Sequence, residues 1–405
     1  MYNEYKKYFN NHTIELYNQV KNIKSSYKIK PYFHQEFINL FNTINLDYNI
    51  NHKTLQQTES IIPLVQTKTA IKDIIELEDY MASSKKSIDS IIDCSKYYKI
   101  GDKIKKDILQ TIYKNSFISI EIIKWIEESC SNYYLISWNN IKIHLINDQE
   151  ISKELIDHIV TITKWLLLIK STSPTFKLEI YIFLSDEKKK TPSKCSKKTC
   201  PLNRSHINSG VSWHTKWIQI YRKEELLKVL IHELIHYLNL DIQEYSDQLD
   251  EQCSHIKMHK ESIEILVNES YTELLAIYLH TLYIAKYISN ISREINIKEI
   301  FWELYMNEEK FIIYQINKIF NNYKIPDITF FQSSNDFIQH TNVISYYIIK
   351  YLLFINTKYF ISNYKSITII FNIISYLLPN IFKLNIPNVI INNDLSLRMS
   401  LFQIN

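Results

Sequence analysis

The sequence predicts an α+β protein that is predominantly α-helical, with one small mixed sheet. Alternating apolar patterns, which are typical of strands, are confined to the stretch between residues 134 and 221. Apolar patterns with a helical period precede and follow that stretch. Hydrophobic residues make up 46% of the chain and charged residues 22%, which is the composition of an ordinary folded protein. The 405 residues are enough for at least one sizeable core.

The patterns divide the chain at about residue 130. Residues 1–130 carry short helical patterns, such as Thr69–Met81 and Lys103–Tyr113, and no recognisable chemical motif. We therefore expect a helical N-terminal region of unknown role, followed by one larger domain over residues 131–405.

The larger domain is predicted to have an α/β subdomain (131–259) and a helical subdomain (260–405). In chain order, the first is expected to contain a strand, a helix, two strands and a final helix: Trp138–Ile146, Ile151–Lys170, Phe176–Ser185, Thr215–Tyr221 and Lys223–Asn239. The second is expected to contain four helices: Glu261–Ser289, Ile297–Phe320, Thr341–Asn356 and Tyr364–Leu378. This order implies a cleft between the halves, with Lys223–Asn239 at the junction.

Charge and hydropathy exclude several classes of protein. The net charge of +4 is mild for this length and argues against a dedicated nucleic-acid binder. The longest apolar runs, Val343–Ile355 and Ile367–Leu378, are too short to span a bilayer, so no membrane partner is expected. No signal peptide is recognisable, and the five cysteines form no disulfide framework. An intracellular location is therefore expected.

The residue usage is skewed towards isoleucine, asparagine, lysine and tyrosine, and the chain has only two glycines. Because glycine codons are GC-rich, this skew indicates an AT-rich genome, such as those of giant viruses and some protozoan parasites. If the protein is viral, the expected location is the cytoplasm or the virion.

The most informative motif is His232-Glu233-Leu234-Ile235-His236, an HExxH run inside the predicted helix. Positions i and i+4 lie one above the other on a helix, so both histidines can reach one metal ion. Glu233 is rotated by about 100° from His232 and is free to hold a water molecule instead of the metal. The alternative is a pair of satisfied core histidines on a buried helix.

A catalytic zinc site normally has three protein ligands. The metzincin pattern would place glycine and histidine where this chain has Asn239 and Ile242, and an aspartate at the latter position is absent too. A later glutamate remains. The segment Asn268-Glu269-Ser270-Tyr271-Thr272-Glu273 resembles the NExxSD segment of thermolysin-like gluzincins, with threonine and glutamate in the last two motif positions.

The resemblance implies a zincin-like catalytic domain with one zinc ion held by His232, His236 and Glu269. Glu273 would then orient His232 through its second ring nitrogen. Thirty-two residues separate His236 from Glu269, more than in thermolysin itself. The intervening stretch is polar and is expected to loop out, and the long gap leaves open whether Glu269 or Glu273 is the ligand.

The resemblance also implies a zinc-dependent peptidase acting on a peptide or protein substrate. Glu233 would take a proton from zinc-activated water and pass it to the leaving amine. A gluzincin also needs a donor to the oxyanion, and the candidates are Tyr347 and Tyr346, with His340 behind them.

The residues before the motif are candidates for substrate binding. The predicted strand Thr215–Tyr221, which includes Trp217, would be an edge strand beside the substrate, as in many zincins. Gly210 indicates a backbone with positive φ or a close approach to substrate, or else a simple turn.

Two other classes of function stay open. The first is a non-catalytic virion, scaffold or interaction protein that retains a structural metal. A purely structural site has no use for a base such as Glu233, which argues against this class. The second is a zinc hydrolase that acts on a non-peptide amide.

Overall fold

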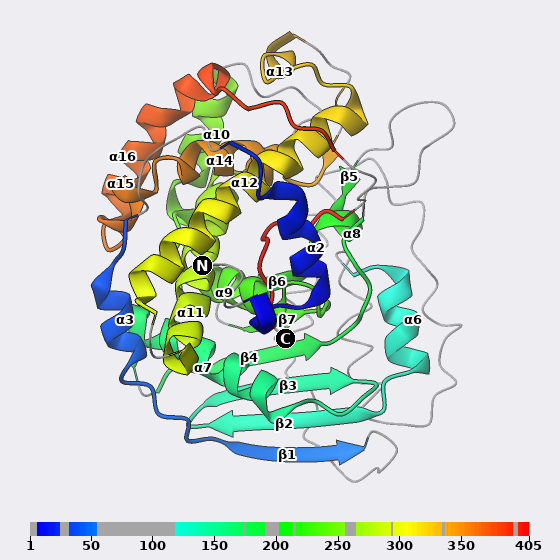
Figure 1. The fold of residues 1–405 in the computed structure, drawn as a ribbon. Coiled ribbons are helices and arrows are strands. Elements are labelled where there is room, and N and C mark those ends of the chain that lie inside the picture. Colours follow the sequence, from blue (N-terminus) through cyan, green and yellow to red (C-terminus); the bar gives the residue numbers. More distant parts are fainter. Residues whose placement is uncertain are drawn as a thin grey trace.

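A computed structural model gives the fold of the chain (Figure 1). It describes residues 6–24, 32–54, 118–173, 175–190, 202–213, 216–255, 265–292, 295–333, 337, 339–391 and 396–404. The architecture is α+β and mainly helical, with one mixed sheet of six strands. The predicted helices Thr69–Met81 and Lys103–Tyr113 lie outside the described residues.

The main sheet has the strand order β1-β2-β3-β4-β7-β6. Its strands are β1 (Asn49–Thr54), β2 (Asn132–Trp138), β3 (Ile141–Asn147), β4 (Leu178–Phe183), β6 (Gly210–Trp213) and β7 (Trp217–Ile220). The β3–β4 and β4–β7 pairs are parallel, and the other three pairs are antiparallel. A second, two-stranded parallel sheet joins β5 (Leu202–Asn203) to β8 (Gln339–His340).

Two features of the sheet differ from the prediction. The stretch Trp138–Ile146 was expected to form a single strand. It instead contains the last residue of β2, a turn at Asn139 with a φ of 46°, and most of β3. Asparagine tolerates positive φ, which suits this tight turn. The N-terminal region is also not purely helical, because β1 pairs with β2 and the sheet crosses the predicted boundary at residue 130. The short polar β1 depends on that pairing rather than on its own propensity.

The helices before the HExxH motif are η1 (Lys6–Tyr8), α2 (Asn11–Val20), α3 (Gln35–Phe41), α6 (Ile120–Glu128), α7 (Lys153–Lys170) and α8 (Arg204–Ile207). The later ones are α9 (Leu226–Tyr237), η3 (Gln243–Tyr245), α10 (Ser246–His255), α11 (Val267–Ser292), α12 (Ile297–Tyr323), α13 (Phe330–Ser333), η4 (Ile344–Ile349), α14 (Lys350–Phe354), α15 (Thr357–Ile361), α16 (Ile367–Leu377) and η5 (Leu378–Lys383). Of these, η4 is a π-helix, and the other η elements are 3-10 helices.

Several helical segments of the structure differ from the predicted ones. The helix expected at Thr341–Asn356 begins with the π-helix η4, a form that is often found at functional sites. The helix expected to end before Pro379 continues as the 3-10 helix η5. Pro379 lies in the first turn of η5, where its missing N–H costs no helical hydrogen bond. The polar stretch expected to loop out after His236 forms η3 and α10, and Leu249 and Cys253 on α10 are buried.

The two faces of the sheet are covered by different elements. Ile143 and Leu145 of β3 belong to the large core with α7 and α9, whereas the neighbouring Ile146 packs with Ile122 of α6. This alternation is that of a strand whose successive side chains point to opposite faces. Helix α11 packs against both α9 and α12, and Figure 1 shows α12 farther from the sheet than α9. Among the described residues, no helix is long and apolar enough to cross a membrane.

The start of α9 is held by a buried carboxylate. Glu225 is the N-cap residue, with a φ of 59°, and the helix begins at Leu226 rather than at the predicted Lys223. The Glu225 carboxylate accepts hydrogen bonds from the backbone N–H groups of Met399 (2.9 Å) and Ser400 (2.6 Å). The C-terminal segment 396–404 is thus built into the core beside the helix that carries the HExxH motif.

Candidate metal centre

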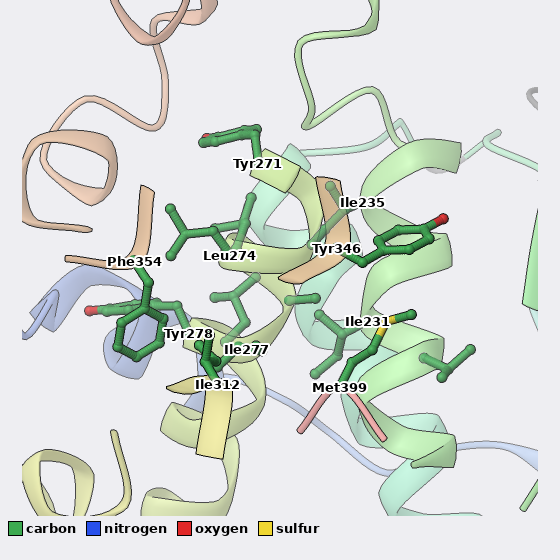
Figure 2. Packing of buried hydrophobic residues seen from close by; sticks show 14 of the residues in the cluster. Ile231, Ile235, Tyr271, Leu274, Ile277, Tyr278, Ile312, Tyr346, Phe354 and Met399 are labelled. Atoms are coloured by element: carbon green, nitrogen blue, oxygen red, sulfur yellow. The ribbon is translucent and has the colours of Figure 1, made fainter. Parts of the chain in front are cut away.

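Helix α9 is buried almost completely, so its side chains are fixed by packing on several sides. Its residues Ile231 and Ile235 face Leu274 and Ile277 of α11 (Figure 2). The β6 and β7 strands and α7 pack on its other sides. The HExxH residues therefore lie on a helix with little freedom to move.

Three side chains converge on one point between α9 and α11. The Nε2 atoms of His232 and His236 are 3.1 Å apart. The Glu269 carboxylate faces both atoms, with Oε2 3.4 Å from His232 Nε2 and Oε1 3.4 Å from His236 Nε2. Ligands about 2.0 Å from a tetrahedral zinc ion are about 3.3 Å apart, so these spacings are of the size that such a site needs. This is the metal-compatible cluster found among the described residues.

The other ring nitrogen of each histidine faces a carboxylate. His232 Nδ1 lies 2.9 Å from Glu273 Oε1, a short polar contact that is not aligned as a regular hydrogen bond. His236 Nδ1 lies 2.5 Å from Asp241 Oδ2. A carboxylate at Nδ1 favours the tautomer whose Nε2 lone pair is free. Two such lone pairs and a carboxylate oxygen that converge on one point are an arrangement suited to a cation.

Asp241 is a site residue that the sequence reasoning missed. It follows His236 by five positions and is brought back to the ring by a turn in which Asn239 has a φ of 49°. The signal in the sequence is an asparagine, which tolerates this conformation, directly after the helix and an aspartate shortly after it. Glu273, in turn, contacts His232 at Nδ1, while the carboxylate of Glu269 faces the Nε2 atoms of both histidines.

The cluster is rich in negative charge. Burial disfavours a proton on His236, but Glu269 and Asp241 outweigh it and raise the pKa of this histidine well above its usual value. Burial likewise opposes ionisation of Glu269, but His236 and His232 hold its pKa below the usual range. The site therefore attracts positive charge at its centre.

Glu233 lies beside the cluster without joining it. Its carboxyl group is buried, and burial raises its pKa, as does the nearby Glu269, while His232 and His236 oppose the shift. A side-chain hydrogen bond from Ser212 of β6 also lowers the pKa. A buried carboxylate with a raised pKa is suited to accept and then release a proton. Ser212 was not singled out from the sequence, because nothing local marks a serine on a short strand.

At Gly210 the backbone of β6 lies close to the Glu233 side chain. A Cβ atom at this position would lie 2.7 Å from Glu233 Oε1 and 2.9 Å from Val229 Cγ1. The φ of Gly210 is not positive, so the expected alternative of a special backbone conformation is wrong. The glycine is needed for space, and the neighbour is the Glu233 side chain.

An open cleft of about 430 Å³ leads to the cluster. Besides His232, Glu233, His236 and Glu269, its walls include Arg204, Asn208, Gly210, Val211, Ser212, Asn239, Asp241, Gln243, Leu266, Thr341, Asn342 and Tyr346. Most of these residues have an amide, hydroxyl or charged side chain, yet about half of the surface that the cleft presents is apolar. The cleft is therefore suited to a ligand that carries both polar and apolar groups.

The two candidate tyrosines point in different directions. Tyr346 extends from η4 towards α9 and lines the cleft, and its hydroxyl donates to Glu269 Oε2 at 3.2 Å (Figure 2). Tyr347 is buried, and its hydroxyl donates to the carbonyl of Leu397 at 2.7 Å. His340 lies exposed on β8 and is not among the residues lining the cleft. Only Tyr346 of the three reaches the cluster.

The strand that borders the cleft is β6, not the one predicted. The expected edge strand, seen as β7, lies between β4 and β6 inside the sheet. Trp217 on β7 packs on the α6 face, near Trp213, and does not line the cleft. In the described sheet no strand pairs with the outer side of β6. This short strand was missed because four residues beginning with glycine give no clear alternation.

Comparison with known proteins found no family model, no curated protein and no solved structure that matches this chain. The chemistry of the cluster and the cleft therefore carries the functional interpretation.

Proposed function

We propose that this protein is a zinc-dependent peptidase of the gluzincin type. The observation that supports it best is the convergence of His232, His236 and Glu269 beside a buried carboxylate, Glu233, that is not part of the cluster. Two imidazoles and one carboxylate are a donor set that zinc prefers in hydrolases. Three ligands among the described residues leave a fourth position for water or substrate, which favours a catalytic site over a structural one.

The residues around the cluster supply the chemistry of amide hydrolysis. When bound, zinc would polarise the substrate carbonyl and acidify water. Glu233 takes the proton of the attacking water and delivers it to the leaving amine, and its buried position beside the cluster places it for this transfer. The Tyr346 hydroxyl donates a hydrogen bond to the oxyanion that forms at the carbonyl.

The outer edge of β6 offers a place for a peptide. The Tyr221 N–H donates to the Ser209 carbonyl, so the Gly210–Ile220 pair is a non-hydrogen-bonded one. The backbone N–H and C=O groups of Gly210 and Ser212 therefore point away from β7. An extended substrate can pair with them as an added strand, directly beside Glu233. This geometry favours a peptide over a small amide.

Metal removal tests the proposal directly. We expect a chelator to abolish hydrolysis of a mixture of unstructured peptides by the purified protein, and one equivalent of zinc to restore it. Mass spectrometry of the products should show cleavage at peptide bonds with addition of water. Hydrolysis that survives complete zinc removal, or a zinc-loaded protein that cuts no peptide, would contradict the proposal.

Gly210→Ala is expected to lower kcat while leaving the fold intact. The added methyl group would press on the Glu233 carboxylate at 2.7 Å and shift it from its position. A displacement of about 1 Å can cost roughly 100-fold in rate. Steady-state kinetics and thermal unfolding measure the two effects separately. Unchanged kcat would show that this contact does not position Glu233.

Tyr346→Phe is expected to lower kcat by about 100-fold or more, the effect of removing one oxyanion donor. Tyr347→Phe is the matched control, because its hydroxyl bonds to Leu397 rather than to the cluster. That variant should lose about 1 kcal/mol of stability and little activity. Equal activity losses in the two variants would argue against a role for Tyr346 in the reaction.

A further inference from the structure

We propose that Lys228 is a positioning residue for the metal centre, because its ammonium group fixes the Glu273 carboxylate that orients His232. The inference rests on the proposed function, since it concerns the metal affinity of the same site. It goes further by assigning a role to a buried lysine outside the HExxH motif.

The contacts form a chain from Lys228 to the metal ligand. Lys228 Nζ donates to both carboxylate oxygens of Glu273, at 2.7 Å and 3.0 Å. The nearer oxygen, Oε1, is also the one that lies 2.9 Å from His232 Nδ1. One carboxylate oxygen therefore contacts both the ammonium group and the ring, and moving it alters both contacts.

The positions in the fold make this chain rigid. Lys228 lies one helical turn before His232 on α9, so the two side chains share a face of the helix. Glu273 reaches them from α11. The side chains of Lys228 and Glu273 are 1% and 2% exposed, so water cannot replace either partner. Removing one charge leaves the other buried and without its partner.

Glu225 and Glu308 also attract the Lys228 ammonium group, but Glu273 is the carboxylate that accepts its hydrogen bonds. Among the described residues, its other hydrogen-bond contact is the Met399 sulfur at 3.8 Å, and a thioether is a weak acceptor. The Met399 carbonyl is taken by Lys350 Nζ at 3.2 Å. The direction of the Lys228 ammonium group is therefore set by Glu273.

A purely structural role does not account well for this ion pair. Buried ion pairs can often be replaced by apolar side chains without loss of stability. What an apolar pair could not provide here is a carboxylate at a fixed position beside a metal-binding histidine. The expected signature is thus a change in metal affinity that is separate from any change in stability.

The chain contains a matched control for this test. Lys189 forms a second buried ion pair with Glu225 at 2.8 Å, with side chains that are 2% and 0% exposed. Glu225 bonds to the backbone of Met399 and Ser400 rather than to a ligand of the cluster. Lys189 also attracts Glu273 electrostatically, but its hydrogen bond is to Glu225. Lys189→Met therefore removes a similar buried charge from the same region without breaking the Lys228–Glu273–His232 contacts.

The experiment compares Lys228→Met with Lys189→Met in the full chain. Zinc affinity is measured by competition with a chromophoric chelator, and stability by thermal unfolding of the metal-free proteins. Both variants should unfold at lower temperature. Only Lys228→Met should bind zinc about 10- to 100-fold more weakly, which is the usual effect of losing a residue that orients a ligand.

A double-mutant cycle with Glu273→Gln separates positioning from general damage. If Lys228 acts through Glu273, the double variant should lose no more zinc affinity than the weaker-binding of the two single variants. If the losses of zinc affinity in the two single variants multiply in the double variant, Lys228 acts independently of Glu273. That result would overturn the proposal.

Other outcomes are equally decisive. Lys228→Met that folds and binds zinc like the wild type overturns the positioning role alone, as does an equal loss of affinity in Lys189→Met. If Lys228→Met does not fold, Lys228→Gln and Lys189→Gln, which keep an N–H donor, are compared in the same way. A wild-type protein that binds no zinc would overturn the proposed function itself, and the role of Lys228 with it.

Discussion

Glu233→Gln is expected to lower kcat for peptide hydrolysis by about 100- to 10,000-fold, because the amide cannot accept a proton from water. Glu233 is not one of the three residues of the metal cluster, so zinc should still bind with one ion per chain. Steady-state kinetics with a fluorogenic peptide measure the first effect, and elemental analysis measures the second.

Activity and bound zinc together show which role Glu233 has. Loss of activity with retained zinc assigns Glu233 to the reaction rather than to metal binding. Full activity in Glu233→Gln would contradict the proposed proton transfer. Loss of zinc together with activity would mean that Glu233 supports the cluster instead.

Glu269→Ala is expected to remove stoichiometric zinc from the purified protein. Its carboxylate lies 3.4 Å from both Nε2 atoms, at the third corner of the cluster. Loss of a residue that only orients a ligand weakens zinc binding by about 10- to 100-fold, so loss of a ligand should weaken it by more than that. Zinc affinity measured by chelator competition tests the expectation.

Glu273→Gln provides the comparison, since it lies one turn further along α11 and contacts His232 at Nδ1. It should retain zinc with weakened affinity. If Glu273→Gln loses zinc while Glu269→Ala keeps it, the two glutamates have the opposite roles. That result would decide the question left open by the long gap after His236.

The local part of the site could be predicted from the sequence because helical geometry is local. Two histidines at i and i+4 on a helix must lie on one face, and α9 places them there. The same period puts Glu269 and Glu273 on one face of α11. The broad α+β class, with strands concentrated in the middle of the chain, followed from apolar periodicity in the same way.

The rest of the site depends on contacts that no local pattern encodes. Ser212 and Gly210 reach Glu233 only because β6 folds back antiparallel to β7 beside α9. Asp241 comes back to His236 through a single left-handed asparagine. Lys228 looks like an ordinary helical lysine until α11 brings Glu273 against it.

For a related reason, the sequence could not show which of the two candidate tyrosines reaches the metal cluster. Tyr346 and Tyr347 are adjacent and have the same chemistry, so the sequence offered no way to separate them. The π-helix η4 directs one into the cleft and the other towards Leu397. Predicting that outcome requires the position of the C-terminal segment, which packs there from far along the chain.

The proposed metal centre is tested by a crystal structure of the zinc-loaded protein with anomalous diffraction data collected at the zinc edge. We expect one ion bonded to the Nε2 atoms of His232 and His236 and to Glu269 at about 2.0–2.2 Å, with a fourth position open to the cleft. An ion held by Glu273, a fourth protein ligand closing the site, or no anomalous signal at the cluster would contradict it.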